Sequence, residues 1–472
     1  MGEVTTPPFA AGVDQGHGQR VADGALPPPA APLEADPAGA PKDLSGDTPR
    51  DAKSDGSSDT PADPARPGAG HLAGTFDSLR VRDYRLLFQG SAVTSIGFWM
   101  QQVALGWLVL DLTNSPFYLG LASFARSFPM LVVSPFGGVL ADRLNRRFLI
   151  LSTQVAQLIL TAALAVLVFT GVVTISHVLI ASLLMGVAMS MHVPARQALI
   201  PALVGRHRLS NALALYSMSL NTSRIIGPSL AGAVMGLAGV GGCLALQSAG
   251  YVWAVVNVLQ IRSGDRQSDG RASSTVMQNL IEGFRYCYRT KAIFTQLLIA
   301  AVPTIFAYPY MNFLPSFARD QYRIGPEGLG LLMTCMGLGA LAGSFALASR
   351  RQLRRKSLVT VICAGLFGLS LCLFAMAPWL PLALVFLAFA GASSSVYMTL
   401  NGTILQEICP DEYRGRVSSV YMVTWGMMPL GAVPAGALAE AYGAPLTVFV
   451  GGAICLVFAV GMLLFRPQLR SV

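Results

Sequence analysis

Charged side chains are scarce in this chain, and their scarcity excludes most soluble folds. Only 12% of the 472 residues are Asp, Glu, Lys or Arg, whereas 53% are hydrophobic. A soluble domain carries roughly 25% charged residues because its surface faces water. The composition therefore predicts a protein that is largely embedded in a lipid bilayer.

Metal, disulfide and nucleotide motifs are also missing from the sequence. The seven cysteines form no C-x-x-C pair and the five histidines are scattered, so the sequence indicates neither a metal site nor a disulfide framework. No glycine-rich run leads into Gly-Lys-Ser or Gly-Lys-Thr, which excludes a P-loop for ATP. We therefore expect no cofactor and no enzymatic activity.

The charges that are present divide the chain near residue 75. Residues 1–75 contain 12 of the 29 prolines and have a net charge of −6, while residues 76–472 have a net charge of +15. The first segment is too polar to bury a core, so we expect a disordered, acidic cytoplasmic tail. Basic chains often bind nucleic acid, but here the arginines separate apolar stretches of about 20 residues, the length that crosses a bilayer. Nucleic acid is therefore excluded as a partner.

Twelve apolar stretches predict an all-α protein with twelve transmembrane helices. The hydrocarbon core of a bilayer is about 30 Å thick, a distance that about 20 helical residues cross. The expected spans are 88–110, 117–140, 148–170, 174–195, 213–237, 241–261, 293–315, 328–348, 357–376, 379–401, 416–438 and 443–465.

Clusters of arginine mark every second loop between these stretches, while the opposite loops hold only Arg319 and Arg323. Cytoplasmic loops carry an excess of Lys and Arg, so the pattern predicts that both termini lie in the cytoplasm. The clusters lie at Arg143–Arg147, Arg206–Arg208, Arg262–Lys291, Arg350–Lys356 and Arg414–Arg416.

The longest basic loop, residues 262–292, divides the body into two six-helix halves, 76–261 and 293–472. Weak echoes between the halves suggest that they are pseudo-symmetric. Two halves joined by a basic linker are typical of parallel-repeat transporters, whose substrate site lies near mid-membrane between the halves. The linker is also expected to contain an amphipathic helix on the cytoplasmic surface, because an apolar side chain recurs every four residues at Val276, Leu280, Phe284 and Tyr288.

The turn after the second stretch carries a signature. An apolar helix ends there in Gly137-Gly-Val-Leu-Ala-Asp-Arg-Leu-Asn-Arg-Arg147, which resembles the loop motif G-x-L-A-D-R-x-G-R-R of the major facilitator superfamily. Asn145 stands where the family prefers glycine, a mild departure because asparagine also tolerates the left-handed conformation. The motif is expected to act as a conformational switch that holds the halves together in one state, formed by Gly138, Asp142, Arg143, Arg146 and Arg147.

A second resemblance narrows the group to exporters. Three short runs, Trp99–Gln102, Pro194–Ala198 and Arg414–Val417, resemble the exporter branch that includes the enterobactin exporter and macrolide efflux pumps. The run Asn221-Thr-Ser-Arg-Ile-Ile-Gly-Pro-Ser-Leu-Ala-Gly232 is similar to the Gly-Pro motif of the superfamily's antiporters. The resemblance implies alternating access, usually driven by proton exchange.

The glycines and the proline of the run Asn221–Gly232 can also be interpreted from helix geometry alone. Gly227 and Pro228 are expected to bend and thin the fifth helix. Gly232, four residues before Gly236, is expected to give a flat face against which a neighbouring helix packs. Ordinary helix packing accounts equally well for these residues.

Two arginines lie within apolar stretches, where a charge is costly and usually functional. Arg126 lies near the middle of the second stretch and Arg224 lies in the fifth. Either they form a cationic cavity for an anionic or polar substrate, or they pair with backbone carbonyls or a structural acid. Uncharged polar residues of the stretches are candidates for the same cavity, although packing explains each one alone: Gln101, Gln102, Asn221, Asn312 and Asn401.

Acidic residues are absent from the centre of every expected span. This departs from the many proton antiporters of the superfamily that place an acid within the N-terminal half. Glu407, at the inner end of the tenth stretch, is a candidate proton relay. An ion pair between Glu407 and Arg414 or Arg416 is the competing interpretation.

Together with these features, the family resemblance implies a monomeric secondary active transporter of the bacterial inner membrane that exports a small amphipathic molecule, such as a siderophore, a drug or another natural product. Protons are the expected coupling ion, by family resemblance. Two alternatives remain: an importer of the same fold, and a membrane receptor or assembly partner that transports nothing.

Overall fold

The computed structural model describes residues 76–143, 145–262, 276–350, 353, 355–410 and 412–465. The chain divides into two compact units, Met1–Pro67 and Gly68–Val472, and all of the described residues belong to the second. The acidic tail expected at residues 1–75 and the first part of the expected linker lie outside the described residues.

Every regular element among the described residues is a helix, which confirms the all-α prediction. The elements are η1 (Asp77–Arg80), α2 (Arg82–Thr113), α3 (Pro116–Arg143), α4 (Arg146–Phe169), α5 (Ile175–Leu259), α6 (Val276–Arg289), α7 (Lys291–Val302), η2 (Pro303–Ala307), α8 (Tyr310–Ser316), η3 (Phe317–Gln321), α9 (Pro326–Ala348), α10 (Lys356–Ala375), α11 (Leu380–Ile408), α12 (Arg414–Gly426), α13 (Met428–Tyr442) and α14 (Ala444–Phe465).

Eleven helical segments of the described chain are long and apolar enough to cross a membrane. One of them consists of two helices joined at a glycine. That segment, His207–Leu259, has 53 residues and would be about 80 Å long as one straight helix. Its backbone leaves the helical region at Gly239, where φ is 66°. Beyond this point the chain turns back, because the Sγ of Cys243 donates a hydrogen bond to the carbonyl oxygen of Ala231 at 3.4 Å. Divided at Gly239, the segment brings the candidate spans to the twelve expected.

The span Lys291–Gln321 differs from the regular helix expected at 293–315. It contains two π-helical turns, η2 and η3, in which Tyr308 N donates to Pro303 O and Tyr322 N donates to Phe317 O, both at 2.9 Å. Proline lacks the N–H group that would continue the α-helical hydrogen bonding, and this span contains Pro303, Pro309 and Pro315. The wider turns extend the span beyond its predicted end.

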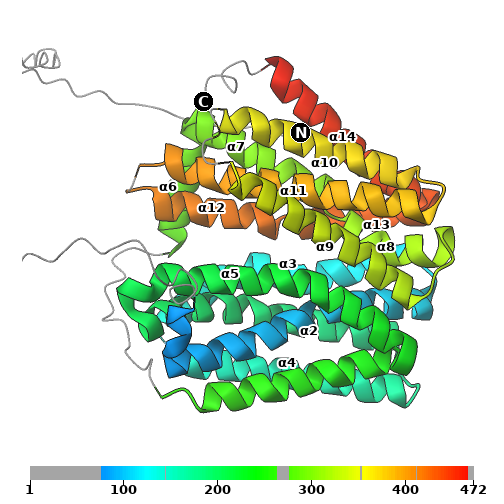
Figure 1. Ribbon diagram of the computed structural model, residues 1–472, viewed down its shortest axis with the longest axis horizontal. Helices are drawn as coiled ribbons and strands as arrows, with labels where there is room; N and C mark the ends of the chain where they lie inside the picture. The colour runs from blue at the N-terminus through cyan, green and yellow to red at the C-terminus, as the bar shows by residue number, and fades with distance from the viewer. Residues whose placement is uncertain are drawn as a thin grey trace, which may run out of the picture. The chain divides into compact units, whose positions relative to one another are not determined.

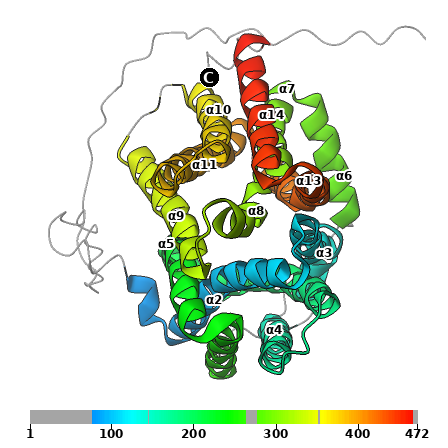
Figure 2. The same cartoon turned by 90° about the vertical axis from the view of Figure 1, so that its right-hand side faces the viewer.

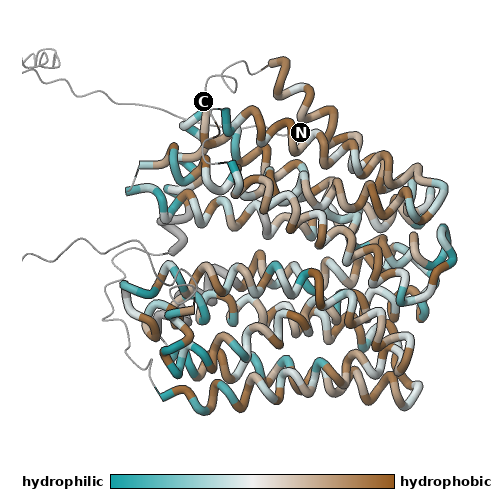
Figure 3. Tube along the Cα trace, viewed as in Figure 1, coloured by the Kyte–Doolittle hydropathy of each residue, from teal (hydrophilic) through white to brown (hydrophobic). Residues whose placement is uncertain are grey.

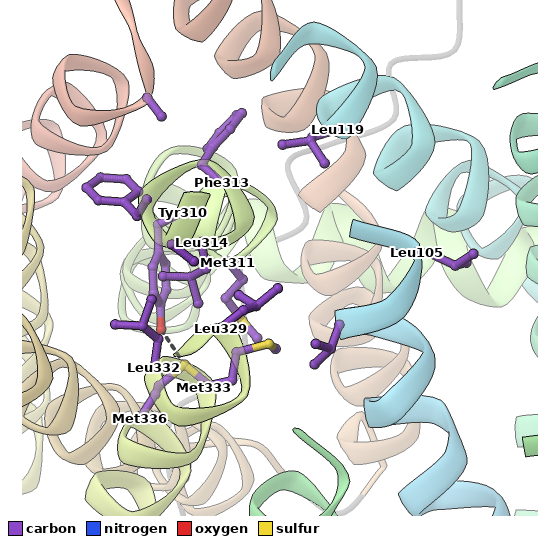
Figure 4. Packing of buried hydrophobic residues seen from close by; sticks show 14 of the residues in the cluster. Leu105, Leu119, Tyr310, Met311, Phe313, Leu314, Leu329, Leu332, Met333 and Met336 are labelled. Atoms are coloured by element: carbon purple, nitrogen blue, oxygen red, sulfur yellow. Dashed lines mark hydrogen bonds between the residues drawn. The ribbon is translucent and has the colours of Figure 1, made fainter. Parts of the chain in front are cut away.

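Helices α2 to α5 lie together in one group and α7 to α14 in another, as Figures 1 and 2 show. Apolar side chains of α8 and α9 fill the space beside α2 and α3. In Figure 4 the Tyr310 hydroxyl of α8 donates to the Sδ of Met336 in α9 at 2.6 Å. Leu105 of α2 and Leu119 of α3 belong to the same buried cluster, so one continuous core joins the two groups.

Large apolar side chains also cover the outside of the bundle. The hydrophobic colour in Figure 3 runs along the helices, and hydrophilic residues gather near their ends. Phe345 is 74% exposed and Val457 is 71% exposed. Such an outer surface suits lipid chains and would be a liability in water.

The linker contains a helix, α6, but the face that it presents to the bundle differs from the predicted stripe. Phe284 and Tyr288 are exposed, while Gly283 and Cys287 are buried. A Cβ at Gly283 would lie 3.0 Å from the Arg416 carbonyl oxygen of α12, so glycine allows close packing there. An ion pair of 3.1 Å between Glu282 and Arg416 lies beside this contact. Phe284 and Tyr288, the two members of the predicted apolar stripe whose side chains are described, therefore face away from the protein.

Candidate functional site

A cavity of about 280 Å³ lies near the middle of the helices of the first group. Its walls come from α2, α4 and α5, and none of its lining residues is Asp or Glu. Thr94, Ser95, Phe98, Trp99, Gln154, Gln157, Met189, His192, Arg196, Leu220, Asn221, Arg224 and Tyr251 line it.

Close contact between α2 and α5 shapes one wall of this cavity. A Cβ at Gly227 would lie 2.5 Å from the Cβ of Trp99 and 2.8 Å from the carbonyl oxygen of Ile96. Because only glycine fits there, α5 approaches α2 directly and the indole of Trp99 is held at the cavity wall. The chain stays helical through Pro228, and its breaks within α5 occur at Gly205 and Gly239 instead.

Arg224 lies in the cavity wall, in the region where the sequence predicted an intramembrane charge. Its Cζ lies 5.4 Å from the centroid of the Trp99 ring, which is within reach of a cation–π interaction. Its Nε is buried and has no hydrogen-bond partner among the described residues. A Cβ at Gly337 of α9 would lie 3.2 Å from the Arg224 carbonyl oxygen, so Arg224 lies close to both groups of helices.

Arg196 is a second cavity arginine, which the sequence reasoning did not identify as a site residue. It is 6% exposed, its Cζ lies 4.6 Å from the Tyr216 ring centroid, and its Nε also lacks a described partner. One helical turn earlier, the Nδ1 of His192 lies 3.1 Å from the Thr153 hydroxyl. The expected fourth span ended at residue 195, whereas the helix continues to Gly205.

Arg126 lines a second, smaller cavity of about 40 Å³. That volume is enough for about one or two water molecules. Gln102 of α2 and Asn312 of α8 also line it, so this cavity lies between the two groups of helices. The Cζ of Arg126 is 4.5 Å from the ring centroid of Phe98, and Phe98 lines the larger cavity as well. A residue that lines the larger cavity therefore contacts the arginine of the smaller one.

Positive charge in both cavities has no acidic counterpart among the described residues. Arg126, Arg196 and Arg224 are in none of the ion pairs found in the described part of the chain. The lining of each cavity is likewise without Asp or Glu. Since buried charges are normally paired, this arrangement can accept an anion.

Two other predicted cavity residues lie elsewhere, and a third is at the rim. The side chain of Gln101 is buried against Met185, with Nε2 at 3.3 Å from Sδ. Asn401 is fully buried and donates from Nδ2 to the Gln296 carbonyl oxygen at 3.0 Å, which ties α11 to α7. Asn221 lines the larger cavity but is exposed, and its amide donates to Ser217 O at 3.1 Å.

Glu407 has a partner other than those we expected. Its carboxylate pairs with the ammonium group of Lys356, because α10 begins at Lys356 beside the end of α11. Arg416, which we considered as its partner, instead pairs with Glu282 of α6. Glu407 is half exposed and is not among the lining residues of either cavity.

The signature turn is only partly described. Helix α3 runs to Arg143, and the side chains of Gly138, Asp142 and Arg143 lie outside the described part. Asn145 has φ −59°, so it is not left-handed as its substitution for glycine suggested. It is the N-cap of α4, and its side chain accepts hydrogen bonds from the backbone N–H groups of Arg147 and Phe148.

The two described arginines of this turn bind carbonyl groups within the first group of helices. Arg146 donates to Ala198 O at 3.1 Å, and Arg147 donates from Nη2 to Leu259 O at 2.7 Å. Leu259 is the last residue of α5, where carbonyl groups are unsatisfied and a positive charge is favourable. These contacts hold α4 and α5 together and do not reach the second group.

Contacts between the two groups gather at the opposite end of the helices. A Cβ at Gly232 would lie 3.2 Å from the Glu327 Cα, so α5 and α9 touch through their backbones. Ser229 and Thr334 share a hydrogen bond of 2.7 Å across the same contact.

Polar groups extend this contact to the loop between α2 and α3. The hydroxyl of Ser115 donates to Glu440 of α13 at 2.7 Å. Arg319 donates to Leu110 O at 3.0 Å and to the side chain of Asn114 at 2.9 Å.

Comparisons with known proteins agree on one group of transporters. A family model described as "Transmembrane secretion effector" matches residues 73–472. The staphyloferrin A transporter of Staphylococcus aureus is 27% identical over 79% of this chain and 94% of its own length. A multidrug efflux pump of Mycolicibacterium fortuitum is 26% identical over 78% of this chain and 92% of its own. An enterobactin exporter of Shigella boydii is 25% identical over 72% of this chain and 80% of its own length.

Solved structures share the fold at low sequence identity. The nucleoside transporter NupG superposes with a TM-score of 0.67 at 13% identity, over 81% of this chain and 99% of that one. An inward-facing bacterial homolog of the human lysosomal transporter Spinster superposes with a TM-score of 0.64 at 16% identity, over 82% of this chain and 98% of that one. At these identities the likeness concerns the fold alone.

Proposed function

This chain belongs to the transmembrane secretion effector family of the major facilitator superfamily, and from that premise we propose that it exports a small amphipathic molecule, such as a siderophore, a drug or another natural product. It is a multi-pass membrane transporter and not an enzyme. We place it in the bacterial inner membrane as a monomer with both termini in the cytoplasm. The observation that carries the proposal is the cavity of about 280 Å³ midway along the helices, lined by aromatic and polar side chains.

The transport cycle that we propose is alternating access between the two six-helix halves, 76–261 and 293–472. Contacts between Gly232 and Gly330, and between Ser115 and Glu440, would close the external end while the cargo enters from the cytoplasm. These contacts would separate when the cargo leaves. Arg146 and Arg147 would keep the first half rigid by binding helix-end carbonyls, so that it moves as one body.

For the driving force we propose proton antiport, which rests on the superfamily resemblance. Glu407 does not line either cavity and forms a half-exposed ion pair with Lys356, which argues against a role as the proton relay.

Transport by everted membrane vesicles tests this proposal. The candidate cargo is the compound that disappears from the medium of a deletion strain. Everted vesicles that contain the chain should accumulate it, and collapse of the proton gradient should stop accumulation. Accumulation that survives complete collapse overturns proton coupling, while net uptake into intact cells favours an importer. Binding of a partner protein without any transport favours a receptor.

A further inference from the structure

We infer that the cargo is an organic anion with a flat apolar part and a hydrogen-bond donor, held between Arg196 and Arg224 of the larger cavity. This inference rests on the proposed function and names the substrate class of the same site. It depends on three observations: unpaired cations, aromatic walls and unpaired amide oxygens.

The first observation is that the two arginines of the cavity have no acidic partner among the described residues. Arg196 and Arg224 both line the cavity, and each has a buried Nε without a partner among the described residues. Each guanidinium lies over an aromatic ring, Tyr216 for Arg196 and Trp99 for Arg224. Because these buried Nε atoms have no partner in the described part of the chain, they are available to donate to a carboxylate, which guanidinium groups bind in a bidentate geometry.

The acids that would be needed for a different cargo are missing from the lining. A cationic drug would require a carboxylate to balance its charge in a desolvated site. None of the lining residues of either cavity is Asp or Glu. Arg126, whose Cζ lies 4.5 Å from the centroid of the Phe98 ring, adds a further positive charge nearby. The field in this part of the protein thus favours anions and opposes cations.

Aromatic walls and amide oxygens describe the rest of the cargo. Phe98, Trp99 and Tyr251 provide flat apolar surface. The Oε1 atoms of Gln154 and Gln157 are buried without a donor, and the Nε2 of Gln157 is already bound to Met185 O at 3.1 Å. Buried acceptors without donors are costly, so a hydroxyl or amide N–H of the cargo would satisfy them. An aromatic hydroxycarboxylate combines all three properties.

Equilibrium binding to the purified full-length chain tests the inference. The chain is placed in nanodiscs of zwitterionic phosphatidylcholine, and binding of 6-hydroxy-2-naphthoate, its uncharged amide and 2-naphthoate is measured by calorimetry. We expect the hydroxynaphthoate to bind at least tenfold more tightly than the amide. Loss of the hydroxyl in 2-naphthoate should weaken binding by a smaller factor. Equal affinity for the acid and the amide, or no binding of the acid, overturns the inference.

Arginine variants locate the site, and a matched control excludes a general charge effect. Arg196→Gln and Arg224→Gln should each weaken binding of the hydroxynaphthoate tenfold or more and leave the amide unaffected, while the Lys variants retain part of the affinity. Arg285→Gln, which changes an exposed arginine of α6, should bind like the unchanged protein. Wild-type affinity in both Gln variants overturns the assignment. The comparison of acid with amide in the unchanged protein needs no variant to fold.

Transport of the same probes separates this inference from the proposed function. Selective binding of the acid without efflux from proteoliposomes contradicts export but upholds the anion site. Efflux of the amide as fast as the acid upholds export and overturns the anion site.

Discussion

Replacing Gly330 by alanine should separate the two halves at their closed end. A Cβ at this position would lie 2.7 Å from the Pro228 carbonyl oxygen and 3.0 Å from the Gly232 Cα. An ordinary contact of a Cβ begins at about 3.4 Å, so α5 and α9 would have to move apart by several tenths of an ångström. Overpacking of this kind costs typically 1–3 kcal/mol, which lowers the population of the closed arrangement by roughly 5- to 150-fold.

Disulfide formation between Ser229→Cys and Thr334→Cys measures this closure. The two hydroxyl groups share a hydrogen bond of 2.7 Å across the same contact, so the paired cysteines should cross-link readily under mild oxidation. Gly330→Ala should slow the cross-link at least fivefold in membranes, as measured by mass spectrometry. Gly402→Ala is the matched control, because nothing lies within 4 Å of a Cβ there. An unchanged cross-linking rate in Gly330→Ala, at normal expression, would refute the reasoning.

Three further predictions concern the reversal of α5, the ion pair of α11 and the linker helix. Gly239→Ala should lower thermal stability by about 1–3 kcal/mol, because φ 66° with ψ −171° is a conformation nearly restricted to glycine; Gly461→Ala, in open space, should leave the melting curve unchanged. Glu407→Gln should change transport less than twofold, since exposed ion pairs contribute at most about 1 kcal/mol; a loss of proton coupling would make Glu407 the relay. Burial raises the pKa of Cys287 from 9.0 to about 11, so the free energy of unfolding should be unaffected by this thiol below pH 9 and fall from pH 9 toward pH 11. Cys287→Ala should flatten that pH dependence in urea titrations.

The span positions could be predicted from the sequence because two independent signals agree. Apolar stretches of bilayer length and clusters of arginine define the same boundaries, and the helices exceed most of them by only a few residues. The expected fourth span ended at residue 195, whereas the chain remains helical through Pro194 and on to Gly205. In a membrane bundle, neighbouring helices can satisfy the backbone groups that proline frees, and a sequence does not reveal those neighbours.

The candidate site was only half visible in the sequence. Arg224 stood out as a charge inside an apolar stretch. Arg196 lay one residue beyond an expected span, within the run Pro194–Ala198, and was not predicted to line a cavity. The sequence also did not show that the side chains of Gln101 and Asn401 pack against neighbouring helices and do not line a cavity. When a helix is apolar on all sides, its sequence pattern does not define which side meets a cavity, so only the packed structure separates cavity residues from helix contacts.

The cavity arginines have an energetic consequence for a cell that maintains a voltage. A cargo that leaves as an anion moves from the negative interior to the positive exterior, so the electric field assists its exit. Each elementary charge moved across 100 mV is worth about 2.3 kcal/mol, which sustains a concentration ratio of roughly 50-fold. A dianion would gain about twice that free energy. By accepting negative cargo without an acid to neutralise the arginines, the chain would make the membrane voltage itself a source of work, in addition to any proton that it exchanges.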